Sequence, residues 1–234
     1  MKVYTDLFVD FDDTLYDTHG NAVEALQELF EDLHLGRWFK QPETFYDEYW
    51  KANIDLWTRY SQGEISRDYL IVERFRRPLS VGMPGEVSKD FCLKASDRFL
   101  EFCSSKPGLV EGARELVDYL MAKGYRLHMC SNGFHEVQYK KLRACGLDGC
   151  FQTVVLSEDA GFNKPSREYF DYAFLTTGAQ PETTLMIGDN LQTDIMGAQR
   201  AGLDTVWFNR FPEYKAPEPV GREITSLSEL MNIL

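Results

Sequence analysis

Three aspartates lie close together where the first apolar run of this chain ends. Asp10, Asp12 and Asp13 follow Phe8 and Val9, which an expected strand would bury. Two carboxylates about 4 Å apart repel each other by roughly 4 kcal/mol at an effective dielectric constant of 20. A bound cation is the usual way to offset that repulsion, so we interpret this group as a candidate metal site.

Polar clusters also follow three later apolar runs. They are Ser131-Asn132-Gly133, Lys164, and Gly188-Asp189 with Asp194. In a doubly wound parallel sheet, ligands bind beyond the carboxyl ends of the strands. Each cluster alone could be an ordinary turn, but acidic, hydroxyl and lysine groups at four successive strand ends indicate one site.

Two other interpretations of these motifs are excluded by single positions. A calcium-binding loop starting at Asp10 would need glycine at its sixth position and glutamate at its twelfth, where this chain has Leu15 and Asn21. The serine-hydrolase pattern G-x-S-x-G is absent around Ser131.

Lys164 stands directly before Pro165, a residue that suits the first position of a helix. A lysine at a helix N-terminus is electrostatically misplaced, because that end favours anions by about 0.3–1 kcal/mol. We therefore expect Lys164 to face a bound anion or neighbouring carboxylates, although a solvated lysine in a turn is the simpler alternative.

Short apolar strands that alternate with helical patterns must position these groups. The expected strands are Val3–Asp10, Arg126–Cys130, Thr153–Leu156, Thr184–Ile187 and Thr205–Phe208. The helical segments between them each run to a glycine, as in GARELVDYLMAKG and PSREYFDYAFLTTG. This alternation predicts an α/β fold with a doubly wound, Rossmann-like parallel sheet.

One block of the chain contains helical patterns without strands. We predict a catalytic core of residues 1–16 and 104–234, interrupted by an all-helical cap domain of residues 17–103. Within the block, a capping box (Asn21, Glu24) and an apolar face (Val23, Leu26, Leu29, Phe30, Leu33) indicate a first helix; Pro42 to Gly63, Ser66 onward, and Pro84 to Cys103 indicate three more. Near the C-terminus we expect a proline-rich surface loop over 212–221 and a short helix with Ser226 and Glu229 as its capping box.

Composition narrows the class of protein. The formal net charge of −12 disfavours binding to a nucleic-acid polymer or an anionic membrane. The five cysteines include no C-x-x-C pair, which argues against disulfide or zinc frameworks. No apolar run is long enough to span a bilayer, and the N-terminus lacks the apolar region of a signal peptide, so we expect a cytoplasmic protein.

The four motifs together resemble those of the haloacid-dehalogenase superfamily. The matching residues are D-x-D-x-T (Asp10, Asp12, Thr14), the hydroxyl Ser131, Lys164, and G-D-x-x-x-x-D (Gly188, Asp189, Asp194). The core resemblance covers residues 1–16 and 104–234, and the helical insert resembles the superfamily's cap between the first and second motifs.

This resemblance implies phosphoryl-transfer chemistry. Asp10 would attack phosphorus and form an aspartyl-phosphate, which splits the hydrolysis into two easier steps. Asp12 would protonate the leaving oxygen and later take a proton from water, a role that needs a raised pKa. Lys164 would assist by stabilising negative charge on the phosphoryl group.

The resemblance also implies a magnesium site and a phosphate site. Mg²⁺ would be held by the Asp10 carboxylate, the Asp12 backbone carbonyl and Asp189, while Asp194 would orient this shell or Lys164. The phosphoryl oxygens would be bound by Thr14, Ser131, the Asn132 backbone and Lys164.

The resemblance also leads to alternatives to a phosphatase, namely a dehalogenase, a phosphomutase and a non-catalytic binding module. The resemblance argues against a 2-haloacid dehalogenase, because that pattern lacks the second aspartate and Asp12 is present here. A phosphomutase shares the four motifs and stays open. A non-catalytic binding module would be expected to lose a key residue, and none is lost.

A closer resemblance points to the substrate, a small phosphate ester. Four segments resemble the pyrimidine 5′-nucleotidase group that acts on noncanonical nucleoside monophosphates: 53–66 (NIDLWTRYSQGEIS), 131–134 (SNGF), 157–165 (SEDAGFNKP) and 201–209 (AGLDTVWFN). Related branches act on phosphoglycolate, sugar phosphates or flavin mononucleotide, and these remain alternatives. The sequence indicates no particular oligomeric state.

An aromatic stripe in the insert suggests a base pocket. Its members recur every three or four residues and so share one helix face: Tyr46, Trp50, Asn53, Trp57 and Tyr60. The stripe could simply be a packing surface between cap and core. However, an amide amid aromatic rings can bind a pyrimidine edge while the rings stack on the base. We therefore predict a pocket of Asn53, Trp57 and Tyr60, helped by Phe134.

Overall fold

The computed structural model describes residues 3–211, 215–216 and 220–234. The chain divides into two compact units, Met1–Thr18 with Pro107–Leu234, and His19–Lys106. Most of the segment 212–221, expected from its prolines to be a surface loop, lies outside the described residues.

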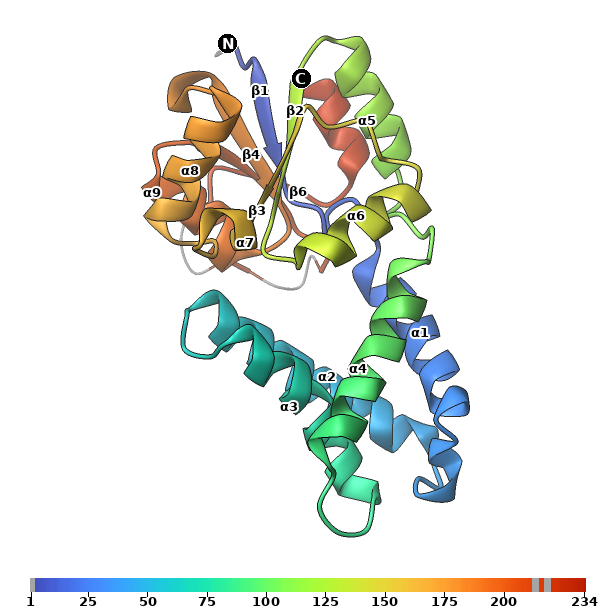
Figure 1. Cartoon of the computed structure of the whole chain (residues 1–234). Helices are drawn as coiled ribbons and strands as arrows, with labels where there is room; N and C mark the ends of the chain where they lie inside the picture. The colour runs from blue at the N-terminus through green and yellow to red at the C-terminus, as the bar shows by residue number, and fades with distance from the viewer. Residues whose placement is uncertain (1–2, 212–214, 217–219) are drawn as a thin grey trace. The chain divides into compact units, whose positions relative to one another are not determined.

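The first unit is built on a parallel sheet with strand order β3-β2-β1-β4-β5-β6 (Figure 1). The strands are β1 (Asp6–Val9), β2 (Arg126–Ser131), β3 (Thr153–Leu156), β4 (Thr184–Gly188), β5 (Asp204–Phe208) and β6 (Arg222–Ile224). Each neighbouring pair of strands is parallel. The predicted doubly wound α/β fold is therefore confirmed.

Successive side chains of β1 point to opposite faces of the sheet, as strand geometry requires. Leu7 and Val9 pack in a cluster with α5 (Ala113–Ala122). Phe8 belongs to a second cluster, with α8 (Arg167–Thr177). Because helices cover both faces, the successive β1 residues Leu7, Phe8 and Val9 are all apolar and buried rather than alternating with polar residues.

Four strand ends differ from the prediction by a single residue, in β1, β2, β4 and β5, and two differences are larger. β1 begins at Asp6 rather than Val3, whose side chain is 74% exposed. The sixth strand, β6, is not apparent from the sequence because only Ile224 of its three residues is buried. A strand this short and polar carries almost no apolar pattern.

The other helical elements of the first unit are short. They are α6 (His135–Ala144), α7 (Ser157–Ala160), α9 (Gly197–Arg200), a π-helical turn (Leu191–Met196), and 3₁₀ turns (Pro181–Thr183, Leu227–Asn232). The π-helical turn is followed directly by α9. The capping box of Ser226 and Glu229 is confirmed.

The second unit, all of whose residues are described, is helical throughout. It contains most of α1 (Thr18–Asp32), then a 3₁₀ turn (Leu35–Arg37), α2 (Pro42–Ser61), α3 (Arg67–Gly82) and α4 (Lys89–Ser104). Its core is a cluster of apolar side chains from all four helices that includes Leu29, Phe45, Phe75 and Phe99.

Two helix starts in this unit agree with the sequence prediction, and two do not. Pro42 is the first residue of α2, and the Ser66 side chain caps α3 by accepting a hydrogen bond from the Tyr69 amide. Asn21 is instead buried inside α1, which begins before it at Thr18. The fourth helix begins at Lys89, where Ser88 supplies the cap.

One member of the predicted apolar face of α1, Val23, is 37% exposed, whereas Leu26, Leu29, Phe30 and Leu33 are buried.

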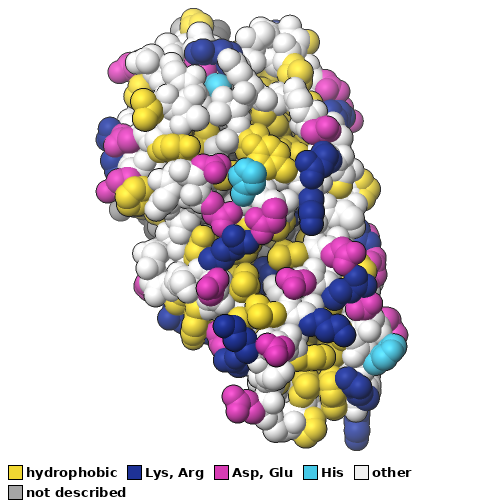
Figure 2. Space-filling view, viewed as in Figure 1, with side chains coloured by type: hydrophobic (Ala, Val, Ile, Leu, Met, Phe, Trp, Pro, Cys, Tyr) yellow, Lys and Arg dark blue, Asp and Glu magenta, His cyan; other side chains and the backbone are white. Residues whose placement is uncertain are grey.

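On the face shown in Figure 2, acidic and basic side chains are interspersed, and no continuous basic area is visible there. Among the described residues, no helix combines the length and apolar character needed to cross a bilayer.

Candidate active site

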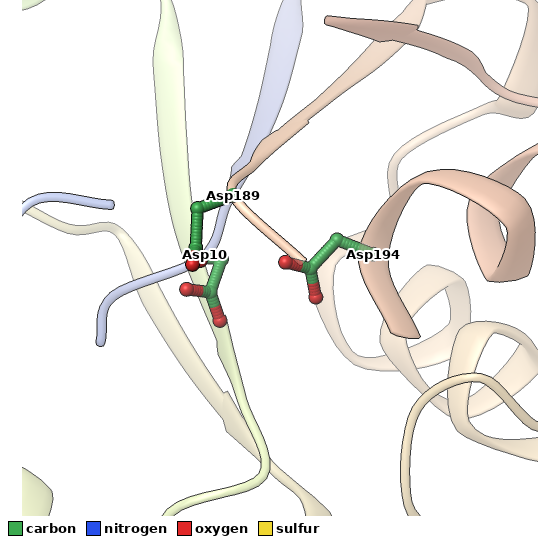
Figure 3. A group of neighbouring side chains, drawn as sticks. All are labelled: Asp10, Asp189 and Asp194. Carbon is green, nitrogen blue, oxygen red and sulfur yellow. The ribbon is translucent and has the colours of Figure 1, made fainter. Parts of the chain in front are cut away.

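The parallel sheet brings the first and fourth motifs together at one edge. β1 lies between β2 and β4, with Val9 in register with Met129 and Ile187. The residues that follow these strands are therefore neighbours although they are far apart in sequence. Figure 3 shows the resulting acidic group, Asp10, Asp189 and Asp194, in which one carboxylate oxygen from each residue lies within 4.8 Å of the other two.

Lys164 forms the centre of the charge network. Its ammonium donates hydrogen bonds to Asp10 Oδ1, Asp194 Oδ1 and the Cys130 carbonyl oxygen, each at 2.7 Å. The lysine side chain is almost fully buried. Burying an ammonium is costly unless it is paired and hydrogen-bonded, and here all three of its protons have acceptors.

The local setting of Lys164 differs from the prediction. Helix α8 begins at Arg167, and Ser166 caps it by accepting a hydrogen bond from the Tyr169 amide at 3.2 Å. Pro165 is therefore not the first helical residue, and Lys164 lies in the loop before the cap. The expectation that Lys164 faces neighbouring carboxylates is confirmed.

Burial shifts the pKa values of this group strongly. It raises the pKa of Asp10 to about 7, against the opposing effect of Lys164 and with a further contribution from Asp194. It would lower the pKa of Lys164, but Asp10 and Asp194 outweigh burial and hold that pKa well above its usual value. Burial and the charges of Asp10 and Asp194 raise the pKa of Asp189 well above its usual range.

Thr14 connects two of the carboxylates. Its hydroxyl lies 3.1 Å from both Asp10 Oδ2 and Asp189 Oδ1, and it accepts a hydrogen bond from the Asp189 amide at 3.0 Å. A hydroxyl has one proton, so it can donate to only one carboxylate at a time. Thr14 therefore reaches the acidic group, where a phosphoryl oxygen could replace one of its acceptors.

Asp194 is fully engaged within the site. Besides Lys164, it accepts hydrogen bonds from the Asn190 amide and the Thr193 hydroxyl, both at 3.1 Å. Gly188 makes room for it, because a Cβ at that position would lie 2.4 Å from Asp194 Oδ2. The glycine of the G-D-x-x-x-x-D motif thus has a steric reason.

Hydrogen-bond donors surround the Asp12 carboxylate, whereas the expected raised pKa would need surroundings that disfavour the charged form. Its Oδ1 accepts hydrogen bonds from Thr18 and Lys141, and its Oδ2 accepts one from the Gln138 amide. Burial alone would raise the pKa of Asp12, but Lys141, Thr18 and Gln138 outweigh it and lower that pKa. The expectation of a raised pKa for Asp12 is therefore wrong for this structure. The physical reason is Lys141, a residue outside the motifs that carry the resemblance.

The second motif, Ser131-Asn132-Gly133, is hydrogen-bonded both to Gln138 of α6 and to the backbone of Lys164. Ser131 Oγ accepts hydrogen bonds from Gln138 Nε2 at 2.6 Å and from the Gly133 amide at 2.9 Å. The Asn132 side chain pairs with the Lys164 backbone twice, at 2.8 and 2.9 Å. This double hydrogen bond fixes the loop that carries Lys164.

The charges of the site fit a divalent cation. Four carboxylates (Asp10, Asp12, Asp189, Asp194) are faced by the two ammonium groups of Lys141 and Lys164. The two negative charges left over match one divalent cation, and carboxylate oxygens are the ligands that Mg²⁺ prefers. Burial is the main cause of the raised pKa values of Asp10 and Asp189, and the neighbouring negative charges add to it.

Sequence reasoning missed three residues at this edge. Gln138 and Lys141, three positions apart on α6, hold Asp12, and Arg210 pairs with Asp13 at 2.8 Å and Asp17 at 3.1 Å. A polar pair at helical spacing directly after the SNG motif was the available signal for Gln138 and Lys141. No pattern marks Arg210, since a single arginine after a strand is common.

The predicted base pocket draws on both units. Phe134 is buried in the first unit, whereas Asn53, Trp57 and Tyr60 are half-buried on α2 in the second. The buried side of α2 is formed by its neighbours Phe45, Tyr49, Ala52 and Leu56. The stripe therefore borders the helical core rather than forming it, and its role as a base pocket stays a prediction.

Comparisons with known proteins identify the family of this chain. A model of the haloacid dehalogenase-like hydrolases matches residues 7–202. The chain is 35% identical to the HAD-hydrolase YfnB of Bacillus subtilis, covering 100% of this chain and 97% of that protein. It is 31% identical to the pyrimidine 5′-nucleotidase YjjG of Escherichia coli, covering 97% and 96% of the two chains.

Solved structures extend the likeness to three dimensions. The crystal structure of B. subtilis YfnB bound to magnesium has a TM-score of 0.86 and 34% identity, covering 99% of each chain. The L-2-haloacid dehalogenase of Xanthobacter autotrophicus has a TM-score of 0.74 over 99% and 98% of the two chains, but its 16% identity shows a shared fold only. From its motifs, its parallel sheet and these matches, the chain belongs to the haloacid dehalogenase-like hydrolase family.

Proposed function

We propose that this protein is a Mg²⁺-dependent phosphomonoester hydrolase that acts through an aspartyl-phosphate intermediate. The observation that carries the proposal is the buried Asp10 carboxylate, 2.7 Å from the Lys164 ammonium and within hydrogen-bond reach of Thr14. The same edge of the sheet presents Asp189 and Ser131, so a nucleophile, cationic and hydroxyl donors, and metal-binding carboxylates lie together.

Asp10 performs the first step. One carboxylate oxygen forms a bond to phosphorus as the bond to the ester oxygen breaks, and that oxygen receives a proton from Asp12. In the second step a water molecule attacks the phosphorus and gives a proton to Asp12. The bond between phosphorus and the Asp10 oxygen breaks, so that inorganic phosphate leaves and the Asp10 carboxylate is restored. Asp12 must therefore be protonated at the start of the cycle, although in this structure its partners favour the carboxylate form.

The remaining residues stabilise charge. The Asp10 carboxylate, the Asp12 carbonyl and Asp189 would hold Mg²⁺, with Asp194 keeping Lys164 in place. The metal would supply positive charge that neutralises the phosphoryl oxygens. Lys164, Thr14, Ser131 and the Asn132 amide would donate to the same oxygens.

The proposed substrate is a pyrimidine nucleoside monophosphate. Support comes from YjjG and from the pyrimidine 5′-nucleotidase PynA of Streptococcus pneumoniae, which is 29% identical over 99% of this chain and 95% of that protein. A glyceraldehyde 3-phosphate phosphatase of Pyrococcus furiosus, 29% identical over 97% of this chain and 92% of that protein, favours a smaller ester as the second candidate.

A substrate panel separates these candidates. Phosphate release is measured with Mg²⁺ for uridine and thymidine monophosphates, glyceraldehyde 3-phosphate, phosphoglycolate, a hexose phosphate and flavin mononucleotide, and halide release for 2-chloropropionate. We expect the highest kcat/KM for a pyrimidine nucleotide. A preference for glyceraldehyde 3-phosphate would favour the second candidate, and halide release without phosphate release would overturn the phosphatase proposal.

The predicted base pocket has its own test. Losing a hydrogen bond to the base costs about 1–3 kcal/mol in specificity. Asn53→Ala should therefore lower kcat/KM for the pyrimidine nucleotide and leave that for p-nitrophenyl phosphate nearly unchanged. Equal losses on both esters would contradict the assignment of Asn53 to a base pocket.

A further inference from the structure

We propose that Lys141 and Gln138 of α6 are positioning residues that set the place of the Asp12 carboxylate for proton transfer. This inference rests on the proposed function, because it gives Asp12 the acid and base roles. Neither residue belongs to the four motifs, and each reaches Asp12 from far along the chain, at separations of 129 and 126 residues.

The contacts around Asp12 come from two elements. Lys141 Nζ contacts Oδ1, which also accepts from the Thr18 hydroxyl, and Gln138 Nε2 contacts Oδ2. An aspartate side chain otherwise rotates about two torsions. Donors on both oxygens fix both torsions, so the position of the carboxylate is set by α6 and the first residue of α1.

Burial indicates that this arrangement is specific. Lys141 is 6% exposed and Gln138 is fully buried. The Lys141 ammonium also lies 5.1 Å from the centre of the Tyr16 ring, which stacks on Phe11. Taking an ammonium out of water is costly, so Lys141 is stable there only with a charged partner, and Asp12 supplies that partner.

Gln138 couples Asp12 to the phosphate-binding motif. Its amide nitrogen lies 2.6 Å from Ser131 Oγ while also contacting Asp12, and its Oε1 is buried with no hydrogen-bond partner among the described residues. A Cβ on Gly133 would lie 1.9 Å from Gln138 Nε2. The glycine of the SNG motif is thus needed to let Gln138 reach both groups.

Position matters for this step because proton transfer requires heavy atoms about 2.6–3.2 Å apart. A misplacement of about 1 Å can cost about 10²-fold in rate. One turn of α6 carries both donors, so the spacing between Asp12 and Ser131 is built into a rigid helix. We therefore assign to α6 the alignment of the proton donor with the phosphoryl group.

The test is a double-mutant cycle on phosphatase activity. Lys141→Met should lower kcat for an alkyl phosphate by about 10²-fold with KM changed less than about twofold. Lys141→Arg, which retains the cation, should recover most of that loss. Lys140→Met, on an exposed neighbour in the same helix, should behave as wild type.

The cycle with Asp12→Asn identifies the route of the effect. If Lys141 acts through Asp12, the double variant should be no slower than Asp12→Asn within about twofold, because interacting residues are not additive. Losses that multiply in the double variant would overturn the inference. Inactivity of the wild-type protein on every phosphate ester would instead count against the proposed function.

A crystal structure of the Lys141→Met variant gives a readout that does not depend on activity. The inference requires the Asp12 carboxylate to leave its present position once the ammonium is gone. If the variant has wild-type thermal stability and Asp12 keeps its place between Thr18 and Gln138, Lys141 does not position Asp12 and the inference fails.

Discussion

At the scale of single residues, the site depends on one buried ammonium. Lys164 pairs with Asp10 and Asp194 at equal distances of 2.7 Å, and within the described part of the chain neither carboxylate has another charged donor that close. The lysine also reaches the Cys130 carbonyl at the end of β2. It therefore links the ends of β1 and β2 as well as neutralising charge.

The nucleophile assignment leads to the first prediction. Asp10→Asn should keep the fold and lower phosphatase kcat by at least about 10³-fold, because an amide cannot form the phosphoenzyme. Phosphate release and circular dichroism measure the two effects, with the substitution verified by mass. Asp171→Asn, on an exposed carboxylate, is the matched control. Near-normal turnover in Asp10→Asn would exclude covalent catalysis by Asp10.

Lys164 leads to a prediction about stability. Lys164→Met leaves Asp10 and Asp194 buried without a cation, and breaking a buried pair in this way costs about 3–5 kcal/mol. Urea unfolding without divalent cations should show this loss in the free energy of unfolding. The exposed control Lys140→Met should change it by no more than about 0.5 kcal/mol. A loss below about 1 kcal/mol for Lys164→Met would contradict a structural role for the ammonium.

At the scale of elements, the two ends of β1 treat a buried carboxylate in opposite ways. Asp6, at the amino end, accepts hydrogen bonds from His128, Arg126 and Thr5. These donors outweigh burial and lower the pKa of Asp6, whereas burial dominates at Asp10 and raises its pKa. At the amino end of β1, the charge of the Asp6 carboxylate is thus stabilised by donors of the protein itself, whereas the carboxyl end retains an excess of negative charge.

The pair at the amino end predicts acid sensitivity. Burial lowers the pKa of His128 despite Asp6, and its Nδ1 has no partner among the described residues. Because the unfolded state then binds a proton more readily, stability should fall as pH drops below about 6.5. The lowered pKa of Asp6 adds a further loss below about pH 4, as that carboxylate becomes protonated.

Urea unfolding at several pH values measures this effect. His128→Phe should be less stable at pH 7 because Asp6 loses a donor, yet its stability should change less between pH 7 and 5 than that of wild type. His19→Phe, which alters a histidine outside the sheet, serves as the control. An identical pH slope in His128→Phe and wild type would show that His128 does not titrate with folding.

At the scale of the whole molecule, the residues of the proposed chemistry and those of the predicted base pocket belong to different units, apart from Phe134. Every residue of the acidic group, with Lys164, Ser131 and Lys141, lies in the unit of Met1–Thr18 and Pro107–Leu234. The predicted base-binding residues Asn53, Trp57 and Tyr60 belong to His19–Lys106. The excess negative charge is therefore a property of the sheet unit itself.

The excess negative charge of the sheet unit predicts how the protein responds to Mg²⁺. Mg²⁺ at about 100 times its dissociation constant should raise the free energy of unfolding by about 2.7 kcal/mol. EDTA should abolish both this increase and the phosphatase activity, and renewed Mg²⁺ should restore them. Asp189→Asn should remove most of the stabilisation. Full activity after exhaustive chelation would contradict a metal-dependent reaction.

Much of the site was predictable because its logic is local and topological. Parallel strands end at one edge of a sheet, so Asp10, Ser131 and Asp189 could be expected to meet once each was seen to follow an apolar run. The helix caps Ser66 and Ser226 depend only on neighbouring residues and were also predictable. By contrast, β6 has one buried residue and left no pattern to read.

The sequence by itself therefore determined the fold, the edge at which the polar motifs meet and the family. The tertiary structure alone decided the state of Asp12, which Lys141 and Gln138 reach across more than a hundred residues. It also placed Lys164 in a loop rather than at a helix start. The physical reason is that a pKa depends on burial and on the charges within a few ångströms, and packing between distant segments sets both.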